Sequence, residues 1–190
     1  MKTIGKVFVL SLVMLAQTVT PAPPMTVSFS SSSATATNVS SKEIVLITVM
    51  VTYKEQSDGP VPAVHDLYFK QGGVPAGTMQ DVVHPQTNMT ITKVALTYVQ
   101  FADGTSWGDG SDRFTQQAIS RRPTIKDLLT NAMAAYQSAS DQGLIDYLTK
   151  YSGTESGFAK TYLNMQKTSG TAAAVAQIQS RVNAAQGRSF

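Results

Sequence analysis

The spacing of hydrophobic residues changes near residue 112, and this change constrains the fold more than any other feature. Before it, apolar and polar residues alternate over short runs that Gly and Pro separate, a pattern typical of antiparallel strands. After it, apolar residues recur at intervals of three and four, the spacing of amphipathic helices. The sequence therefore predicts an α+β chain in which strands precede helices.

The clearest strand signal is residues 44–53, which are rich in β-branched side chains and alternate on one face. The opposite face carries Ile44, Leu46 and Met50, which is too apolar for a solvent-exposed surface, so we expect another element to cover it. Further strands are predicted over residues 64–70, 78–84 and 90–102. Strands at intervals near ten residues predict an immunoglobulin-like antiparallel β-sandwich over residues 25–112.

Asp103 and Gly104 are the strongest turn signal in the chain. An Asp-Gly pair between two strands favours a two-residue type I′ hairpin. That turn would pair Gln100 with Trp107 and would place Trp107 on the same face as Tyr98. We therefore predict that Asp103, Gly104, Trp107 and Tyr98 are structural residues that set the register of the hairpin.

Residues 113–190 form the predicted helical region. A lead helix over residues 113–120 is expected to stop before Pro123. A longer helix over residues 124–139 follows, and its apolar stripe needs a partner surface. We expect it to pack on the second apolar face of the 44–53 strand. Later helices are predicted to begin at Ser140, Thr154 and Thr171.

Charge divides the chain at the same point. Residues 17–112 carry four Lys against eight acidic residues, whereas residues 113–190 carry nine Lys and Arg against four. The two parts are therefore expected to attract each other. Without its first sixteen residues the chain has a net charge of only +1, which argues against a nucleic-acid partner. We interpret Arg121 and Arg122 as a basic pair at a helix junction, with docking on the acidic strands as the alternative.

The N-terminus has the pattern of a secretory signal peptide over residues 1–16. Lys2 and Lys6 precede an apolar run that ends at the small residue Ala16. The run is too short to be a permanent membrane span. We expect cleavage after Ala16, with Ala22 as the alternative, and a periplasmic or secreted protein.

The next segment, residues 17–41, is a Pro- and Ser-rich lead-in. We interpret part of it as flexible linker, and the alternation over residues 25–30 predicts a first strand inside it. The chain has no cysteine, which excludes a disulfide framework and thiolate metal sites. An exported chain of this kind fits a bacterial envelope.

The two histidines are the only obvious candidates for catalytic residues in the sequence. His65, His84 and Asp66 are residue types that hold Zn²⁺ for metal-assisted hydrolysis. Neighbouring residues of a strand point to opposite faces, however, so Asp66 is poorly placed to orient His65. Weak candidates for a calcium site are Asp103, Asp109 and Asp112. A hairpin turn, a polar loop and a helix cap also explain these three, so we assign no catalytic residue, cofactor or metal.

The segment over residues 98–108 ends a strand with Phe-x-Asp-Gly-Thr-x-Trp. It resembles a pattern in uncharacterised secreted bacterial proteins with immunoglobulin-like or fibronectin-III-like β-sandwiches. The resemblance implies an exported all-β module over about half of the mature chain. It carries over no catalytic or ligand-binding residue, and the helical region lies outside it.

The function that these observations favour is an exported, non-catalytic binding or structural module of the bacterial envelope or extracellular space. Its partner would be another envelope protein or a surface ligand, with no nucleic acid and no permanent membrane span. One alternative is a metal-assisted hydrolase that uses His65 and His84. The other is an assembly subunit whose strand edges or helices join further copies.

Overall fold

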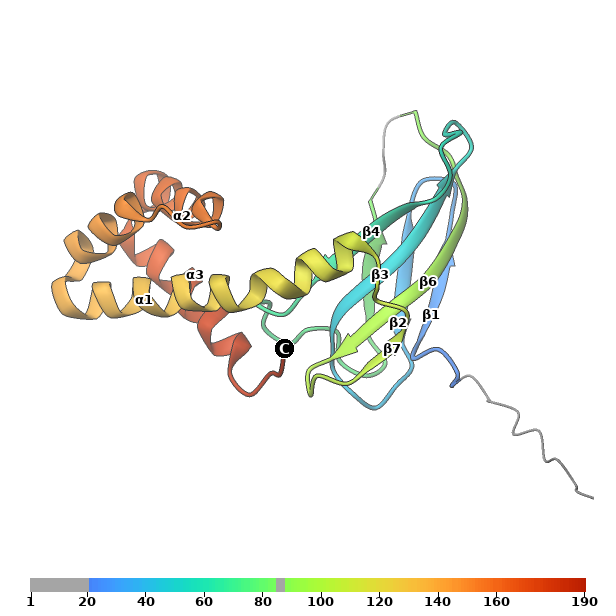
Figure 1. Ribbon diagram of the computed structural model, residues 1–190, viewed down its shortest axis with the longest axis horizontal. Coiled ribbons are helices and arrows are strands. Elements are labelled where there is room, and N and C mark those ends of the chain that lie inside the picture. The colour runs from blue at the N-terminus through green and yellow to red at the C-terminus, as the bar shows by residue number, and fades with distance from the viewer. Residues whose placement is uncertain (1–20, 85–87) are drawn as a thin grey trace, which may run out of the picture.

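The computed structural model of the 190-residue chain describes residues 21–84 and 88–190, so the predicted signal peptide over residues 1–16 lies outside the described residues. Two antiparallel sheets are followed by three helices, which confirms the predicted α+β class (Figure 1). The strands are β1 (Met25–Phe29), β2 (Ala34–Asn38), β3 (Ile44–Tyr53), β4 (Val61–Asp66), β5 (Met79–Val83), β6 (Ile91–Phe101) and β7 (Ser106–Gly108). The helices are α1 (Arg113–Lys150), α2 (Ser156–Ser169) and α3 (Thr171–Ala185).

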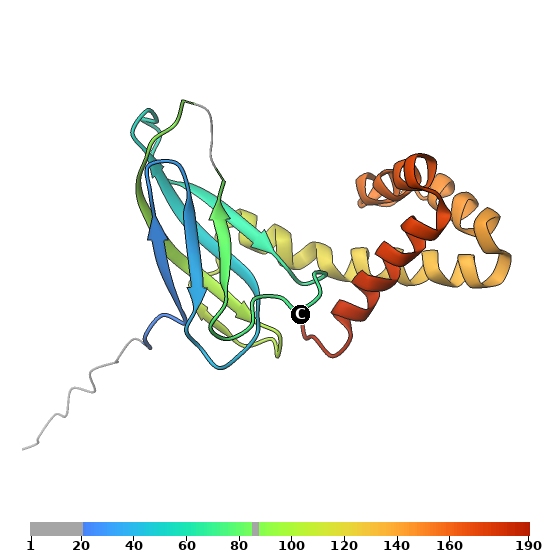
Figure 2. The same cartoon turned by 180° about the vertical axis from the view of Figure 1, so that it is seen from behind.

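The strands form a three-stranded sheet in the order β1-β2-β5 and a four-stranded sheet in the order β4-β3-β6-β7. The two sheets lie face to face, as the front and back views show (Figures 1 and 2). Their inward side chains form one core, in which burial of each large apolar side chain stabilises the fold by about 1.5–3 kcal/mol. This core includes Ala36, Ile47, Val49, Val82 and Val99.

The strand predictions differ in how well they agree with the structure. β3 has the predicted bounds, and β1, β5 and β6 lie within the predicted ranges. β2 was not predicted, because its buried positions are Ala34, Ala36 and Asn38, which together give a weak hydrophobic signal. β4 begins three residues earlier than the predicted 64–70 strand and includes Pro62, which a strand at the edge of a sheet tolerates.

The hairpin between β6 and β7 is shifted by one residue from the prediction. Val99, and not Gln100, pairs with Trp107. The loop contains three residues and ends at Gly104, whose φ is +86°, while Asp103 lacks the positive φ that a type I′ turn requires. Trp107 therefore packs on the core between the sheets, on the face opposite to Tyr98.

Gly104 provides a test of this loop. An alanine Cβ at its positive φ would be strained, and it would lie 2.8 Å from the Cβ of Ser189. We expect Gly104→Ala to lower the free energy of unfolding by about 1–3 kcal/mol. The matched control is Gly157→Ala in α2, where no atom lies within 4 Å and alanine should stabilise the helix by about 0.4–1 kcal/mol. Urea denaturation measures both free energies of unfolding. A change in the same direction for both variants would contradict the three-residue loop with Gly104 at positive φ.

The first helix continues through Pro123, so the predicted stop there is wrong. Proline removes one helical hydrogen bond, but buried Arg122 and Ile125 hold the chain on either side of it. The predicted break at Ser140 is confirmed, because Ala139 and Ser140 have non-helical backbone angles that divide α1 into two segments. In the described part of the chain, no helix combines the length and the apolar character needed to cross a membrane.

The three helices enclose a second core of their own. At the corner of α1, Gly143 lies so close to Ala135 that a Cβ would be 2.2 Å from its carbonyl oxygen. This close approach lets the two segments of α1 fold back toward α2 and α3. The buried side chains of the helical core include Leu128, Leu129, Leu144, Leu148, Tyr162 and Ile178.

A helix covers the outer face of the four-stranded sheet, as the sequence predicts, but the covering segment differs from the predicted one. Thr48 of β3 and Thr115 near the start of α1 are both buried, and their hydroxyl groups share a hydrogen bond of 2.7 Å. Residues 124–139 do not cover the sheet, because Ile125 and Met133 belong to the helical core. The helix continues past Pro123, and its first turns lie on the sheet instead (Figure 1).

A register shift in β3 explains why the predicted outer face is only partly correct. The pairing of β3 with β6 is irregular between Ile44 and Leu46. As a result Ile44 contributes to the core between the sheets. Val45, which strict alternation would place on the same face as Ile47 and Val49, packs instead with Tyr68 and Ala185 on the helical side.

Arg122 is the main polar connection between the helices and the sheets. Its side chain is fully buried, and its Nη2 and Nε donate to the Asp66 carboxylate at 2.9 and 3.2 Å. Its Nη1 donates to Gln100 Oε1 at 2.6 Å, and its guanidinium lies over the Tyr68 ring, 4.6 Å from the centroid. Of the two interpretations of the basic pair, docking on the acidic strands is the one that Arg122 confirms.

The C-terminal residues make a second connection. Tyr68 Oη donates to the Arg188 carbonyl at 2.9 Å, and the Phe190 ring stacks on Tyr68 with centroids 5.2 Å apart. The guanidinium of Arg188 pairs with Glu43. The C-terminus thus returns from α3 to the sheets (Figure 2). Two of the ion pairs, those of Arg122 and Arg188, join the oppositely charged parts of the chain.

Substitution of Arg122 tests whether the connection carries stability. Arg122→Ala would leave Gln100 and Asp66 without their buried donor, so we expect a loss of about 3–5 kcal/mol in unfolding free energy. The value should lie near the lower limit, because the Asp66 side chain keeps 24 % exposure. The control Arg113→Ala removes an exposed arginine from the same helix and should change stability by less than about 0.5 kcal/mol. Equal melting temperatures for the two variants would show that the connection is dispensable.

Candidate functional site

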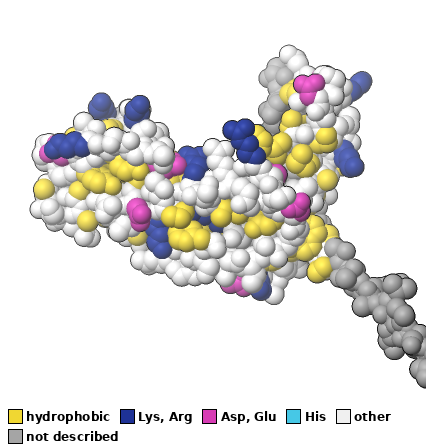
Figure 3. Space-filling view, in the orientation of Figure 1, with side chains coloured by type: hydrophobic (Ala, Val, Ile, Leu, Met, Phe, Trp, Pro, Cys, Tyr) yellow, Lys and Arg dark blue, Asp and Glu magenta, His cyan; other side chains and the backbone are white. Residues whose placement is uncertain are grey.

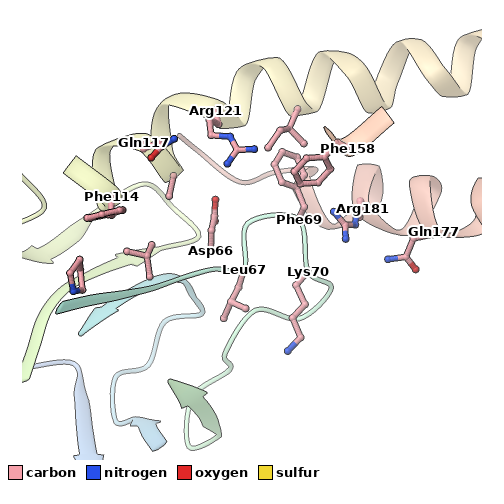
Figure 4. Close-up of a pocket in the computed structure, with 14 residues that line it drawn as sticks. Asp66, Leu67, Phe69, Lys70, Phe114, Gln117, Arg121, Phe158, Gln177 and Arg181 are labelled. Atoms are coloured by element: carbon pink, nitrogen blue, oxygen red, sulfur yellow. The ribbon is translucent and has the colours of Figure 1, made fainter. Parts of the chain in front are cut away.

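A groove of about 700 Å³ lies where the helices meet the edge of the four-stranded sheet. One wall is β4 and the loop after it, and the other wall comes from all three helices (Figure 4). The space-filling view shows a hollow between the helical and sheet parts, with Lys and Arg side chains at its rim (Figure 3). The groove is lined by Pro62, Val64, Asp66, Leu67, Phe69, Lys70, Phe114, Gln117, Ala118, Arg121, Ile125, Phe158, Gln177 and Arg181.

The periodicity of each element explains which side chains reach the groove. Alternate residues of β4 point away from the core, so Pro62, Val64 and Asp66 line one wall. On α1 the lining residues recur at intervals of three and four, which places them on one helical face. α3 contributes Gln177 and Arg181, again four residues apart.

Two ion pairs hold charged side chains at the groove. Arg121 binds Glu155 in a bidentate pair, with Nε to Oε1 at 2.8 Å and Nη2 to Oε2 at 2.6 Å. Glu155 is only 3 % exposed, and its hydrogen bonds raise the pKa of Arg121. Asp66 points toward α1 from the opposite wall (Figure 4), where Arg122 binds both of its oxygens. Each of these charges is therefore balanced inside the protein.

Arg181 and Lys70 differ from these paired groups. The ion pairs among the described residues leave both without a carboxylate partner. The guanidinium of Arg181 lies over two aromatic rings, 5.4 Å from the centroid of Phe158 and 5.8 Å from that of Tyr162. Such cation–π contacts hold the guanidinium plane in place, and they leave its N–H groups available to an acceptor in the groove.

The structure brings the two histidines together but directs Asp66 away from them. The rings of His65 and His84 have centroids 6.4 Å apart. His65 Nε2 is 2.6 Å from the Val82 carbonyl of the other sheet, whereas the Asp66 carboxylate faces α1. The prediction that His65 and Asp66 point in opposite directions is therefore confirmed.

The three aspartates considered for calcium each have a local structural role. Asp103 pairs with Lys42 at 2.7 Å, and this contact, together with hydrogen bonds from Thr105, lowers the pKa of Asp103 to about 2. Asp109 accepts a hydrogen bond from the Ser111 amide. Asp112 caps α1 by accepting from the amides of residues 114 and 115. These are the turn, loop and helix-cap roles of the sequence analysis, and the three residues do not converge.

The described residues contain no group of three or more His, Cys, Asp or Glu side chains arranged to hold a metal ion. What the groove offers instead is a concave surface with aromatic walls, amide side chains and two cations. Sequence reasoning missed Phe114, Phe158, Gln177 and Arg181, which line it. The spacing of the α1 positions was visible in the sequence, but nothing there related them to β4 or α3.

Comparisons with protein-family models, with curated proteins and with solved structures find no match to this chain.

The surroundings of His65 predict how stability depends on pH. Burial lowers the pKa of His65 below 6.5, partly offset by the hydrogen bond to Val82. The unfolded chain, with an ordinary pKa, binds the proton more readily. The difference in His65 pKa between the two states therefore contributes stability above pH 6.5, and this contribution is lost as pH falls toward the folded-state pKa.

We expect His65→Gln to reduce the loss of unfolding free energy between about pH 7.5 and about pH 5.5, measured by urea denaturation. The matched control is His84→Gln, which removes the exposed neighbouring ring and should retain most of the pH dependence. A wild-type profile that His65→Gln leaves unchanged would contradict the prediction.

Proposed function

We propose that the chain is an exported, non-catalytic module that binds its partner in the groove between β4 and the helices. The groove itself carries this proposal. Its volume of about 700 Å³ falls within the range of ligand-binding clefts, and it lies at the junction of two packed parts, where such clefts are common. The walls hold aromatic rings beside a few polar groups, which is the usual composition of a binding site.

The proposal includes an immunoglobulin-like or fibronectin-III-like sandwich. The sheet orders β1-β2-β5 and β4-β3-β6-β7 support it, because they correspond to strands A-B-E and C′-C-F-G of that architecture. Modules of this class serve many unrelated functions, so the sandwich alone does not identify a binding surface. The helices supply the second wall that makes the groove.

The proposal of export rests on the N-terminal sequence. Lys2 and Lys6, the apolar run and Ala16 follow the order of a signal peptide, and the absence of cysteine fits a bacterial envelope. A partner would then be another envelope protein or a surface-bound ligand. An assembly of identical copies is the alternative, and the experiment below separates the two by the mass of the product.

Site-specific photo-crosslinking in the exporting cells tests the groove. A photoreactive amino acid replaces Gln117, which lines the groove, and in the control it replaces Gln137, which is exposed farther along the same helix and is not part of the lining. We expect a crosslinked product at Gln117 and none at Gln137. The mass added to the chain in this product should differ from the mass of a second copy of the chain. No product at Gln117, or equal products at both positions, would contradict the proposed function.

The same preparation tests export. Mass spectrometry of the uncrosslinked protein from the envelope fraction should find an N-terminus that begins at Gln17 or at Pro23. Recovery of the chain with Met1 intact would exclude the signal peptide while leaving the groove to be judged by the crosslinks.

A further inference from the structure

The groove has two chemically different ends. Near the sheet, Phe114 of α1 is 52 % exposed and lies at the end of the groove away from Arg181 and Gln177 (Figure 4); Pro62 and Val64 of β4 belong to the same lining. At the helical end the lining contains Arg181 and Gln177 of α3. A ligand that fills the whole groove therefore needs an apolar part and a polar part along its length.

The charge of the groove indicates the sign of the polar part. Arg121 and Asp66 are both paired within the protein. Arg181 and Lys70 remain, and neither has a carboxylate partner among the described residues, although the Lys70 ammonium donates to Gln80 Oε1 at 3.4 Å. The groove thus presents a net positive charge at the end where Phe158 supports the Arg181 guanidinium. A guanidinium held in this way binds carboxylates in a bidentate manner.

The remaining polar groups favour a peptide. Gln117 and Gln177 line the groove from different helices, and each amide side chain offers both donors and an acceptor. These match the N–H and C=O groups of a peptide backbone. Pro62 lacks a backbone N–H, which weakens the free edge of β4 as a template for another strand, so we expect side chains to hold the bound segment. Two cations without a carboxylate partner are too few to neutralise a run of nucleic-acid phosphates.

We propose that the groove binds an acidic peptide segment of a partner protein, with a carboxylate on Arg181 and an aromatic or other large apolar side chain against Phe114. This inference rests on the proposed function and names the class of partner for the same groove. The occupant is a segment with an apolar residue toward one end and an acidic residue toward the other, because the groove has one apolar end and one cationic end.

Selection from a random dodecapeptide phage library on the full chain tests the proposal. We expect enriched sequences that combine Asp or Glu with Phe, Tyr, Trp or Leu. A synthetic peptide of the enriched sequence should bind, and its affinity should fall as salt is raised, since the charges are partly exposed. Enrichment of basic sequences, or no enrichment, would overturn the proposal. Displacement of the peptide by a single-stranded oligo-dT competitor would also overturn it.

Charge reversal locates the binding. Arg181→Glu should weaken binding of the acidic peptide at least about ten-fold, and selection on that variant should no longer enrich acidic sequences. The control Lys160→Glu makes the same kind of change at an exposed position of α2 outside the lining and should bind as the wild type does. Unchanged affinity in Arg181→Glu would contradict the assignment.

A second pair of variants keeps the test valid if Arg181→Glu fails to fold. Phe114→Ser changes a half-exposed ring in the groove, and Phe29→Ser changes a ring of similar exposure, 48 %, on β1. We expect the peptide affinity to fall about ten-fold only for Phe114→Ser. Equal affinities for the two variants would overturn the apolar contact.

The result can be separated from that of the proposed function. A specific crosslink at Gln117 together with selected peptides that lack acidic residues would refute the acidic-peptide inference and leave the groove as a binding site. Absence of both the crosslink and the enrichment would refute both.

Discussion

Burial of Arg122 is the constraint on which the arrangement of the two parts depends. A fully buried guanidinium is costly unless its charge and its donors are satisfied, and here Asp66, Gln100 and Tyr68 do so together. These partners come from β4, β6 and the loop after β4, so they are assembled only when the sheet is complete. The start of α1 therefore has one favourable position on the sheet, and the groove beside it follows from that position.

The sequence predicted the elements whose signals are local. β3 has β-branched residues at every second position, and Ser140 breaks the helix where the apolar pattern resumes in a new phase. β2 was missed because its apolar contribution to the core consists of two alanines, Ala34 and Ala36, which give a weak hydrophobic signal although both are buried. Pro123 predicts a stop because proline strongly disrupts an isolated helix, yet tertiary packing on both sides of it maintains α1.

The candidate site was less predictable than the fold, because its parts are far apart in the chain. Arg121 and Arg122 form a basic pair in the sequence, but adjacent residues on a helix point about 100° apart. One therefore reaches the sheet and the other reaches Glu155 of the helical part. Nothing in the local sequence distinguishes these two roles. Similarly, Arg181 becomes notable only when α3 packs beside α2 and brings it over Phe158.

Two connections rather than one make the groove a fixed shape. Arg122 attaches the start of the helical part to the sheet, and the stack of Phe190 on Tyr68 attaches its end. A single attachment would let the helices rotate about it, whereas attachments at both ends restrict that rotation. Both converge on Tyr68, in the loop that lines the groove between Leu67 and Lys70. A wall held in this way does not have to be ordered when a ligand binds, which lowers the entropic cost of binding. The residues that stabilise the junction thereby also prepare the surface that we propose for the partner.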